Sequence, residues 1–187
     1  IVEASMSGVK NRVALVTGAG SAKGIGYATA NLLRAAGAKV AITSTTERIY
    51  QRLKEMGGTV EDTFAITADL TDTKSVKSLI ENVEGALGTI DIVINNAAVV
   101  ENHEIDSLSY QDWQDIWERT IGANLIGPAN IMYLASKFMI KNGGGKFINI
   151  SSRVAFRGEP SAPAYGASKA GLNSLGQSLA KALAKDR

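Results

Sequence analysis

Short apolar runs alternate along this chain with longer amphipathic stretches. Several of the runs, such as 13–16 and 90–94, place apolar residues at nearly every position. Such runs are typical of strands in a parallel sheet that helices cover on both faces. The runs predict five strands, at residues 12–17, 39–44, 63–68, 90–95 and 146–150.

The stretches between these runs carry apolar residues at helical spacing and therefore predict helices. Glycine pairs and triplets at 57–58 and 143–145 are typical helix ends, and Asp72 is interpreted as a helix cap. The predicted helices span residues 24–36, 47–56, 73–87, 110–141 and 164–185.

Regular alternation of strands and helices predicts right-handed βαβ units and an α/β fold. The expected architecture is a Rossmann-type doubly wound parallel sheet in three αβα layers. Ligands of such sheets bind beyond the carboxyl ends of the strands, so chemistry is expected directly after each strand. Residues 10–187 are interpreted as one dinucleotide-binding domain that also carries the catalytic residues, and residues 1–9 as an N-terminal extension or tag remnant.

The composition removes several classes of partner and metal site. A net charge of +2, from 20 basic and 18 acidic residues without a like-charge run, gives no reason to expect nucleic acid or an anionic membrane. The absence of cysteine excludes disulfides and thiolate-bound metals, and a single histidine, His103, excludes a histidine-rich metal site. His103 is interpreted as a surface loop residue near the mouth of the expected cleft. With no apolar stretch of 18 residues and no signal-peptide pattern, the expected location is cytoplasmic.

A glycine-rich turn follows the first predicted strand and precedes a helix. Glycine lets the backbone approach a pyrophosphate closely, and the helix N-terminus adds free N–H groups and partial positive charge. An ordinary loop between strand and helix is the alternative, but this placement favours a dinucleotide site. The candidate cofactor residues in the turn are Gly18, Gly20, Ser21, Lys23, Gly24, Ile25 and Gly26.

The end of the second strand indicates which cofactor binds. A carboxylate there would bind the ribose hydroxyl of NAD, but this chain has Ser44 followed by Thr45. Their hydroxyls, with Arg48 and Lys23, suit a ribose 2′-phosphate, so NADP(H) is favoured over NAD(H). Glu47 complicates this electrostatic argument, and the alternative is that Thr45 or its neighbour caps the next helix while Arg48 is solvated.

Two further strand ends supply cofactor candidates. Asp69, next to Leu70 after the third strand, could accept a hydrogen bond from the adenine amino group. Asn96, Ala97 and Ala98 follow the fourth strand, where the cofactor ribose would lie. Asparagine is also a common turn residue, so this run alone is weak evidence.

Tyr165 and Lys169 are four residues apart, on one face of a predicted helix. The spacing itself is common here, because Tyr50 and Tyr133 also have a lysine four residues later. Tyr165 differs in lying thirteen residues after Ser152, at the end of the fifth predicted strand.

These three side chains could each have a different role in a reaction at a carbonyl group. The phenol of a free tyrosine titrates near pH ~10, and a cation within a few Å can lower such a value by ~1–3 units. Lys169 would supply that cation, so that Tyr165 acts as an acid or base. Ser152 would hold the substrate oxygen by a hydrogen bond.

On these residues the chain resembles the short-chain dehydrogenase/reductase family, over roughly residues 10–187. The shared features are Tyr-x-x-x-Lys, the serine thirteen residues upstream, and an Asn-Asn-Ala run. The resemblance implies a fourth catalytic residue, Asn124, which would hold a water in a proton relay with Lys169. It also implies a homodimer or homotetramer, because the two helices around Asn124 and Tyr165 commonly pack across an interface in the family.

Three features depart from the family's pattern. The glycine turn holds five residues rather than three between Gly18 and Gly24, so either the loop is longer or the role of the first glycine has moved to Gly20. Ala98 replaces the last glycine of the family's Asn-Asn-Ala-Gly run. Family domains are also longer, and two further strands and the segment that covers the substrate are missing from this sequence. An incomplete view of a longer chain is favoured over a truncated product, which would leave apolar surface and a sheet edge exposed.

The leading hypothesis is an NADP(H)-dependent oxidoreductase that transfers a hydride between nicotinamide and a ketone or secondary alcohol, such as a 3-oxoacyl chain. An NAD-dependent alcohol, polyol or sugar dehydrogenase is the alternative enzyme. A cofactor-binding regulator or truncated, inactive subunit is the alternative outside catalysis. No metal is expected to take part.

Overall fold

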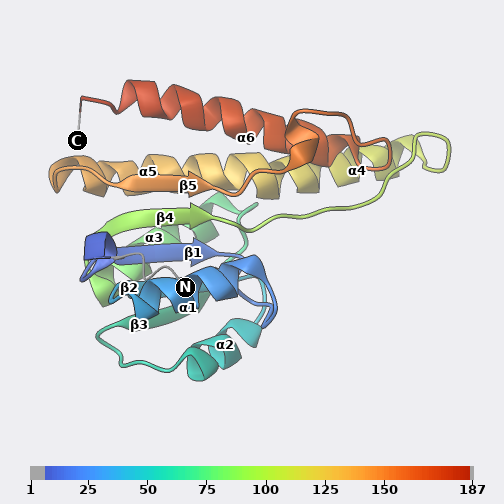
Figure 1. The fold of residues 1–187 in the computed structure, drawn as a ribbon. Helices are drawn as coiled ribbons and strands as arrows, with labels where there is room; N and C mark the ends of the chain where they lie inside the picture. Colours follow the sequence, from blue (N-terminus) through green and yellow to red (C-terminus); the bar gives the residue numbers. More distant parts are fainter. Residues whose placement is uncertain (1–6, 186–187) are drawn as a thin grey trace, which may run out of the picture.

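The computed structural model describes residues 7–185, and a five-stranded parallel sheet forms its centre (Figure 1). The strands lie in the order β3-β2-β1-β4-β5. Successive strands are added on one side of β1 as far as β3 and then on its other side from β4 onward. This confirms the predicted doubly wound α/β fold, with strand boundaries that differ from the predicted ones by at most one residue. The strands are β1 (Val13–Thr17), β2 (Lys39–Ser44), β3 (Thr63–Thr67), β4 (Ile90–Asn95) and β5 (Lys146–Asn149).

Helices cover both faces of the sheet, as the fully apolar strands require. α1 and α2 lie on one face, and α3, α5 and α6 on the other (Figure 1). Three short elements, the 3₁₀ turns η1 (Ser7–Val9) and η3 (Arg153–Ala155) and the π-helical turn η2 (Gly122–Ile126), complete the fold. The α-helices are α1 (Ile25–Ala35), α2 (Arg48–Met56), α3 (Thr73–Leu87), α4 (Tyr110–Ile121), α5 (Gly127–Lys141) and α6 (Pro163–Ala182).

The prediction of one regular helix over residues 110–141 is wrong in one respect. The helical path is continuous, but η2 inserts a wider turn between α4 and α5. Pro128 lies four residues after Asn124, and its missing N–H removes the α-helical partner of the Asn124 carbonyl. Such π turns occur frequently at functional sites.

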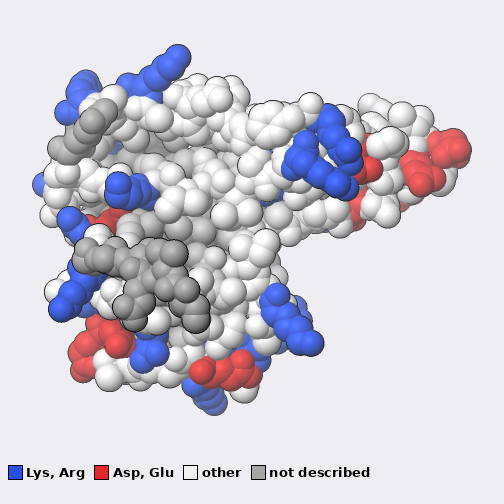
Figure 2. Space-filling model, viewed as in Figure 1, with Lys and Arg blue, Asp and Glu red and all other residues white. Residues whose placement is uncertain are grey.

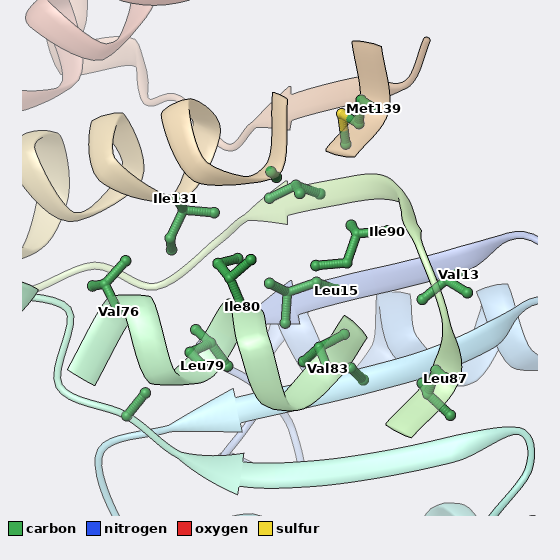
Figure 3. Packing of buried hydrophobic residues seen from close by; sticks show 14 of the residues in the cluster. Val13, Leu15, Val76, Leu79, Ile80, Val83, Leu87, Ile90, Ile131 and Met139 are labelled. Atoms are coloured by element: carbon green, nitrogen blue, oxygen red, sulfur yellow. The ribbon is translucent and has the colours of Figure 1, made fainter. Parts of the chain in front are cut away.

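Alternate residues of the central strand β1 enter two separate cores. Val13 and Leu15 pack toward α3 and α5, whereas Ala14 and Val16 pack toward α1 and α2. Figure 3 shows the first core, in which Leu79, Ile80 and other apolar residues of α3 meet Leu15 and Ile90 of the sheet. Burial on both faces fixes the register, because a slip of one residue would exchange the two sets of side chains.

The outer strand β5 is less buried than the four others. Among residues 7–185 it pairs with β4 alone, and Ile148 is 43% exposed.

Charged side chains are interspersed over the face drawn in Figure 2, where neither sign forms one continuous field. Among residues 7–185, no helix is long and apolar enough to cross a membrane. The same residues contain no cluster of histidine, aspartate or glutamate suited to a metal ion. Residues 1–6 of the predicted N-terminal extension lie outside the described part of the chain, whereas Val9 packs against the core under α1.

Candidate active site

The glycine turn after β1 lies against the loop after β4. Gly18 has a φ of +69°, and a Cβ there would lie 2.6 Å from the Cα of Ala97. Only glycine tolerates both the left-handed backbone and this close approach. The role of the first glycine therefore stays with Gly18 despite the lengthened turn.

Thr17 and Asn96 join these two loops by hydrogen bonds. The Thr17 hydroxyl accepts from the backbone N–H groups of Asn96 and Ala97, at 3.1 and 3.0 Å. The Asn96 side-chain amide donates to the carbonyls of Thr17 and Gly18, at 2.9 and 3.1 Å. Asn96 therefore shapes the edge of the site, and both donors of its amide group are already engaged.

The other glycines let this turn pass close to its surroundings. A Cβ on Gly20 would lie 2.9 Å from the Ser44 side chain, and one on Gly26 would lie 2.5 Å from the amide nitrogen of Asn96. The turn, which is two residues longer than the family's, thus lies directly against Ser44 at the end of β2. Ala98 needs no glycine, since among the described residues Asn11 is the only non-glycine with positive φ.

An open groove of about 570 Å³ runs along the carboxyl ends of the strands. The N-cap of α1 is Gly24, which has no side chain to cap the helix, so the first N–H groups of α1 are available to an anion. Four residues predicted to bind cofactor do not line the groove: Lys23, Gly26, Tyr165 and Lys169. The predicted residues that line it are Gly18, Gly20, Ser21, Gly24, Ile25, Ser44, Thr45, Arg48, Asp69, Leu70, Asn96, Ala97 and Ala98.

The glycine cradle and the uncapped helix beside this groove fit a dinucleotide. At the β2 end, the Ser44 hydroxyl donates to the Thr46 carbonyl at 2.9 Å, and the Arg48 Nε donates to the Thr46 hydroxyl at 3.2 Å. The N-cap of α2 is Glu47 without a side-chain bond, so neither threonine caps that helix. Asp69 accepts from the N–H and hydroxyl of Thr71, whereas Asp72 caps α3 as predicted.

Tyr165 and Lys169 lie one turn apart on α6. Lys169 is 2% exposed, and its Nζ donates to the Ile150 carbonyl at 2.8 Å. Ile150 in turn donates from its N–H to the carbonyl of Asn95, so the ammonium lies at the carboxyl ends of β4 and β5. The Nζ is 5.8 Å from the centre of the Tyr165 ring, and burial lowers the pKa of Lys169.

Ser152 does not end a strand, as the sequence suggested, but begins η3 three residues after β5. Its hydroxyl accepts weakly from the N–H of Val154 at 3.5 Å and can still donate. The neighbouring Ser151 hydroxyl is buried and has no partner among the described residues. Both serines thus leave hydroxyl donors available near the start of α6, with which η3 is in contact.

Asn124 lies fully buried in the π turn, and its side chain is already fully engaged. Its Oδ1 accepts from the Val99 N–H at 2.7 Å, and its Nδ2 donates to the Val99 carbonyl at 2.8 Å and the Ser168 hydroxyl at 3.1 Å. These bonds join the loop after β4, the π turn and α6. A water bound by Asn124 would therefore use its backbone carbonyl.

His103 was predicted to be a surface residue, and this is wrong. It is 1% exposed, and its ring packs edge-on against Trp113 with ring centres 5.3 Å apart. A lone loop histidine is usually solvated, but here Trp113 of α4 and the start of α6 both contact the ring. Figure 1 shows the loop between β4 and α4 reaching the end of the molecule where α6 begins.

Several groove residues were not found from the sequence. Arg119 lines the groove and forms a two-point ion pair with Glu101, at 3.1 and 2.8 Å. Arg119 lies on α4, and its place in the sequence gave no sign of this ion pair, because Glu101 lies 18 residues earlier, in the loop after β4. The remaining unpredicted lining residues are Thr43, Ala68, Thr71, Val99 and Ala123.

A doubly wound sheet with a glycine cradle and a Tyr-Lys helix beside it defines a nucleotide-dependent oxidoreductase class. The family described as short chain dehydrogenase matches residues 12–187. The chain therefore belongs to the short-chain dehydrogenase/reductase family and is an NAD(P)-dependent oxidoreductase, as the resemblance implied.

Relatives from several bacteria support this assignment. An uncharacterized oxidoreductase of Thermotoga maritima is 38% identical over 181 residues, which cover 95% of this chain and 67% of that protein. Galactitol 2-dehydrogenase of Agrobacterium fabrum is 36% identical, with 95% and 66% covered. A 3-oxoacyl acyl-carrier-protein reductase of Staphylococcus aureus is 34% identical, with 91% and 68% covered. The chain thus spans about two thirds of the length of these relatives.

A solved structure resembles the whole described fold. A metagenomic short-chain oxidoreductase in complex with NADP superposes with a TM-score of 0.84 at 30% sequence identity. The match covers 96% of this chain and 80% of the other. The layers and strand order described above are therefore those of the family.

Proposed function

We propose that this protein transfers a hydride between NADP(H) and a ketone or secondary alcohol, using Ser152, Tyr165, Lys169 and Asn124. The observation that carries the proposal is the buried Lys169 ammonium, held one helical turn from Tyr165 at the carboxyl ends of β4 and β5. A buried charge is costly, so its retention beside a phenol favours a catalytic role.

Each side chain has a distinct task in this reaction. The nicotinamide, when bound, supplies or accepts the hydride. The Tyr165 hydroxyl donates its proton to the substrate oxygen during reduction and takes it back during oxidation. Lys169 stabilises the tyrosinate form by its charge, and the Ser152 hydroxyl holds the substrate oxygen.

Asn124 would take part in proton transfer to Tyr165 and Lys169 through its backbone carbonyl. Its carbonyl lacks an α-helical donor because Pro128 has no N–H, so it can accept from a water that passes protons to Lys169. The side chain would keep this carbonyl in place through its bonds to Val99 and Ser168.

The preference for NADP(H) rests on the end of β2. Ser44, Thr45 and Arg48 line the groove there, and a carboxylate that would repel a 2′-phosphate is absent from these positions. Arg48 is exposed, and Thr46 is its one hydrogen-bond partner within residues 7–185, so its side chain can turn toward a phosphate.

For the substrate, we propose a ketone such as a 3-oxoacyl chain, in keeping with the S. aureus relative. The galactitol 2-dehydrogenase relative supports polyol oxidation as a second candidate reaction, for which the alternative cofactor would be NAD. Initial rates with 3-oxoacyl thioesters and with polyols, each with both cofactors, separate the two.

The replacement Tyr165→Phe tests the mechanism. Removing the hydroxyl should lower kcat by about 10²- to 10⁴-fold, because proton transfer contributes that much to the rate. The variant should keep its melting temperature and its affinity for the cofactor. Tyr133→Phe, which alters a tyrosine with the same lysine spacing on α5, is the matched control and should keep full activity. Full activity of the Tyr165 variant would contradict the mechanism.

We also propose that the protein forms a homodimer or homotetramer. Ile126, Tyr133 and Ile140 are seven residues apart along η2 and α5 and are 49%, 60% and 41% exposed. Such a stripe of apolar side chains on one helix is typical of an interface with another copy.

A further inference from the structure

The N-terminus of α6 lacks the usual side-chain cap. The N-cap residue is Ala162, which makes no side-chain hydrogen bond, and Pro163 has no N–H. The first free amide of the helix is therefore that of Ala164, which is fully buried. A buried N–H without a partner would destabilise this end of the helix.

His103 supplies the missing acceptor from another part of the chain. Its Nε2 accepts from the Ala164 N–H at 3.2 Å, across 61 residues of sequence. The backbone N–H of His103 donates to the Ser161 carbonyl at 2.8 Å, directly before the helix. The loop after β4 thus holds the start of α6 by two hydrogen bonds.

The other contacts of the His103 ring indicate which of its two nitrogens carries the proton. The Nδ1 lies 2.7 Å from the carbonyl of Glu101, which can only accept, so the proton resides on Nδ1. Nε2 then carries the lone pair that Ala164 needs. Trp113 packs against the ring, and the ion pair of Glu101 with Arg119 ties the loop to α4.

We propose that neutral His103 is a positioning residue for Tyr165. Ala164 directly precedes Tyr165, so the His103 bond fixes the turn of α6 from which the phenol projects. The inference rests on the proposed role of Tyr165, and His103 itself does not touch substrate. Its loss should displace the phenol relative to Lys169, which is anchored one turn later by Ile150.

Replacing His103 with glutamine or asparagine tests the contributions of Nε2 and Nδ1 one at a time. The side-chain amide of His103→Gln reaches the position of Nε2 and can still accept from Ala164. The shorter amide of His103→Asn ends at the position of Nδ1 and can bond only to the Glu101 carbonyl. The Gln variant should keep kcat within about threefold of the unchanged protein, whereas the Asn variant should lose about 10- to 100-fold, as for a small misplacement of a catalytic group.

The KM for the cofactor should change less than about twofold in both variants, because the groove is intact. Amide hydrogen exchange supplies a readout independent of turnover. Protection at Ala164 should fall in the Asn variant and persist in the Gln variant. The hydrogen-exchange measurement tests the role of His103 even if the unchanged protein proves inactive. Inactivity of the unchanged protein would count against the proposed function instead.

Trp113→Leu is the control for simple loss of packing. It removes the ring neighbour of His103 but not the bond to Ala164, so it should lower the melting temperature while kcat stays within about threefold. Equal kcat in the Asn and Gln variants, or unchanged protection of Ala164 in the Asn variant, would overturn the proposal. A kcat loss in Trp113→Leu as large as in His103→Asn would do the same.

Discussion

Lys169 is a long charged side chain in a position that an apolar residue would fill at lower cost. Among the described residues its hydrogen-bond acceptor is the Ile150 carbonyl alone, and burial lowers the pKa of Lys169. Because the folded state holds the proton less tightly than the unfolded chain, the charged form opposes folding. This is the residue at which stability and the proposed function conflict most directly.

Replacing Lys169 with methionine should therefore stabilise the fold while lowering kcat by at least about 100-fold. At pH 7 we expect the free energy of unfolding to rise by about 1 kcal/mol. The stability of the unchanged protein should increase with pH between the lowered pKa and the value of ~10.4 for a free lysine, so the gain should shrink in alkaline solution.

Chemical unfolding over a range of pH measures this difference. Lys181→Met, at an exposed position near the end of α6, is the matched control and should change stability little. A methionine variant at 169 that is less stable than the unchanged protein at pH 7 would show that the buried charge does not oppose folding.

Arg48 is the residue on which cofactor choice is expected to depend. Reversing its charge with Arg48→Glu should raise the KM for NADP(H) by about 10-fold or more, because a charge-assisted bond to phosphate contributes ~1.5–3 kcal/mol. The KM for NAD(H) should stay nearly constant. Lys181→Glu makes the same charge change at an exposed position near the end of α6 and serves as the control. Equal effects on both cofactors would refute the phosphate assignment.

Among the elements, the turns after β1 and β4 behave as one unit. Thr17 and Asn96 exchange four hydrogen bonds across them with backbone groups, and Gly18 contacts Ala97. The crossover in strand order between β1 and β4 brings these turns together. The shape of the cofactor groove therefore depends on side chains that need not contact the cofactor.

The isosteric change Asn96→Asp tests this unit. A carboxylate would face two carbonyl oxygens instead of donating to them, so we expect a loss of about 1–3 kcal/mol in stability. Cofactor affinity should fall as well. Thermal unfolding and cofactor titration measure the two effects. Asn142→Asp, at an exposed helix end, is the control, and a change at 96 no larger than at 142 would argue against the unit.

At the scale of the whole molecule, the apolar stripe on η2 and α5 is one of the apolar surfaces that the described residues leave exposed. Tyr133 is the most exposed member of the stripe, and Lys137 lies over its ring at 4.6 Å. Burying the stripe against a second copy would remove apolar surface from water at ~25 cal/mol per Å². The stripe is therefore where assembly should be most sensitive to substitution.

Tyr133→Glu should shift the protein toward monomer, because the interface would have to bury an unpaired charge. Light scattering after size-exclusion chromatography gives the mass of each species. Tyr50→Glu, which introduces the same charge at a 41% exposed position on α2, should leave the assembly unchanged. An unchanged mass for the Tyr133 variant would place the interface elsewhere, or show that none forms.

The sequence by itself determined the layers, the parallel sheet and the family, because periodicity and strand-end motifs are local properties of the chain. It also placed most of the groove, since parallel strands bring their carboxyl ends to one edge. Contacts between distant segments had no local signal. The burial of His103, the engagement of Asn124 by Val99 and the ion pair of Arg119 were decided only when loop, helix and sheet came together. The physical reason is that a side chain's hydrogen-bond partner and its exposure depend on what folds against it, and the order of residues fixes this only through the whole structure.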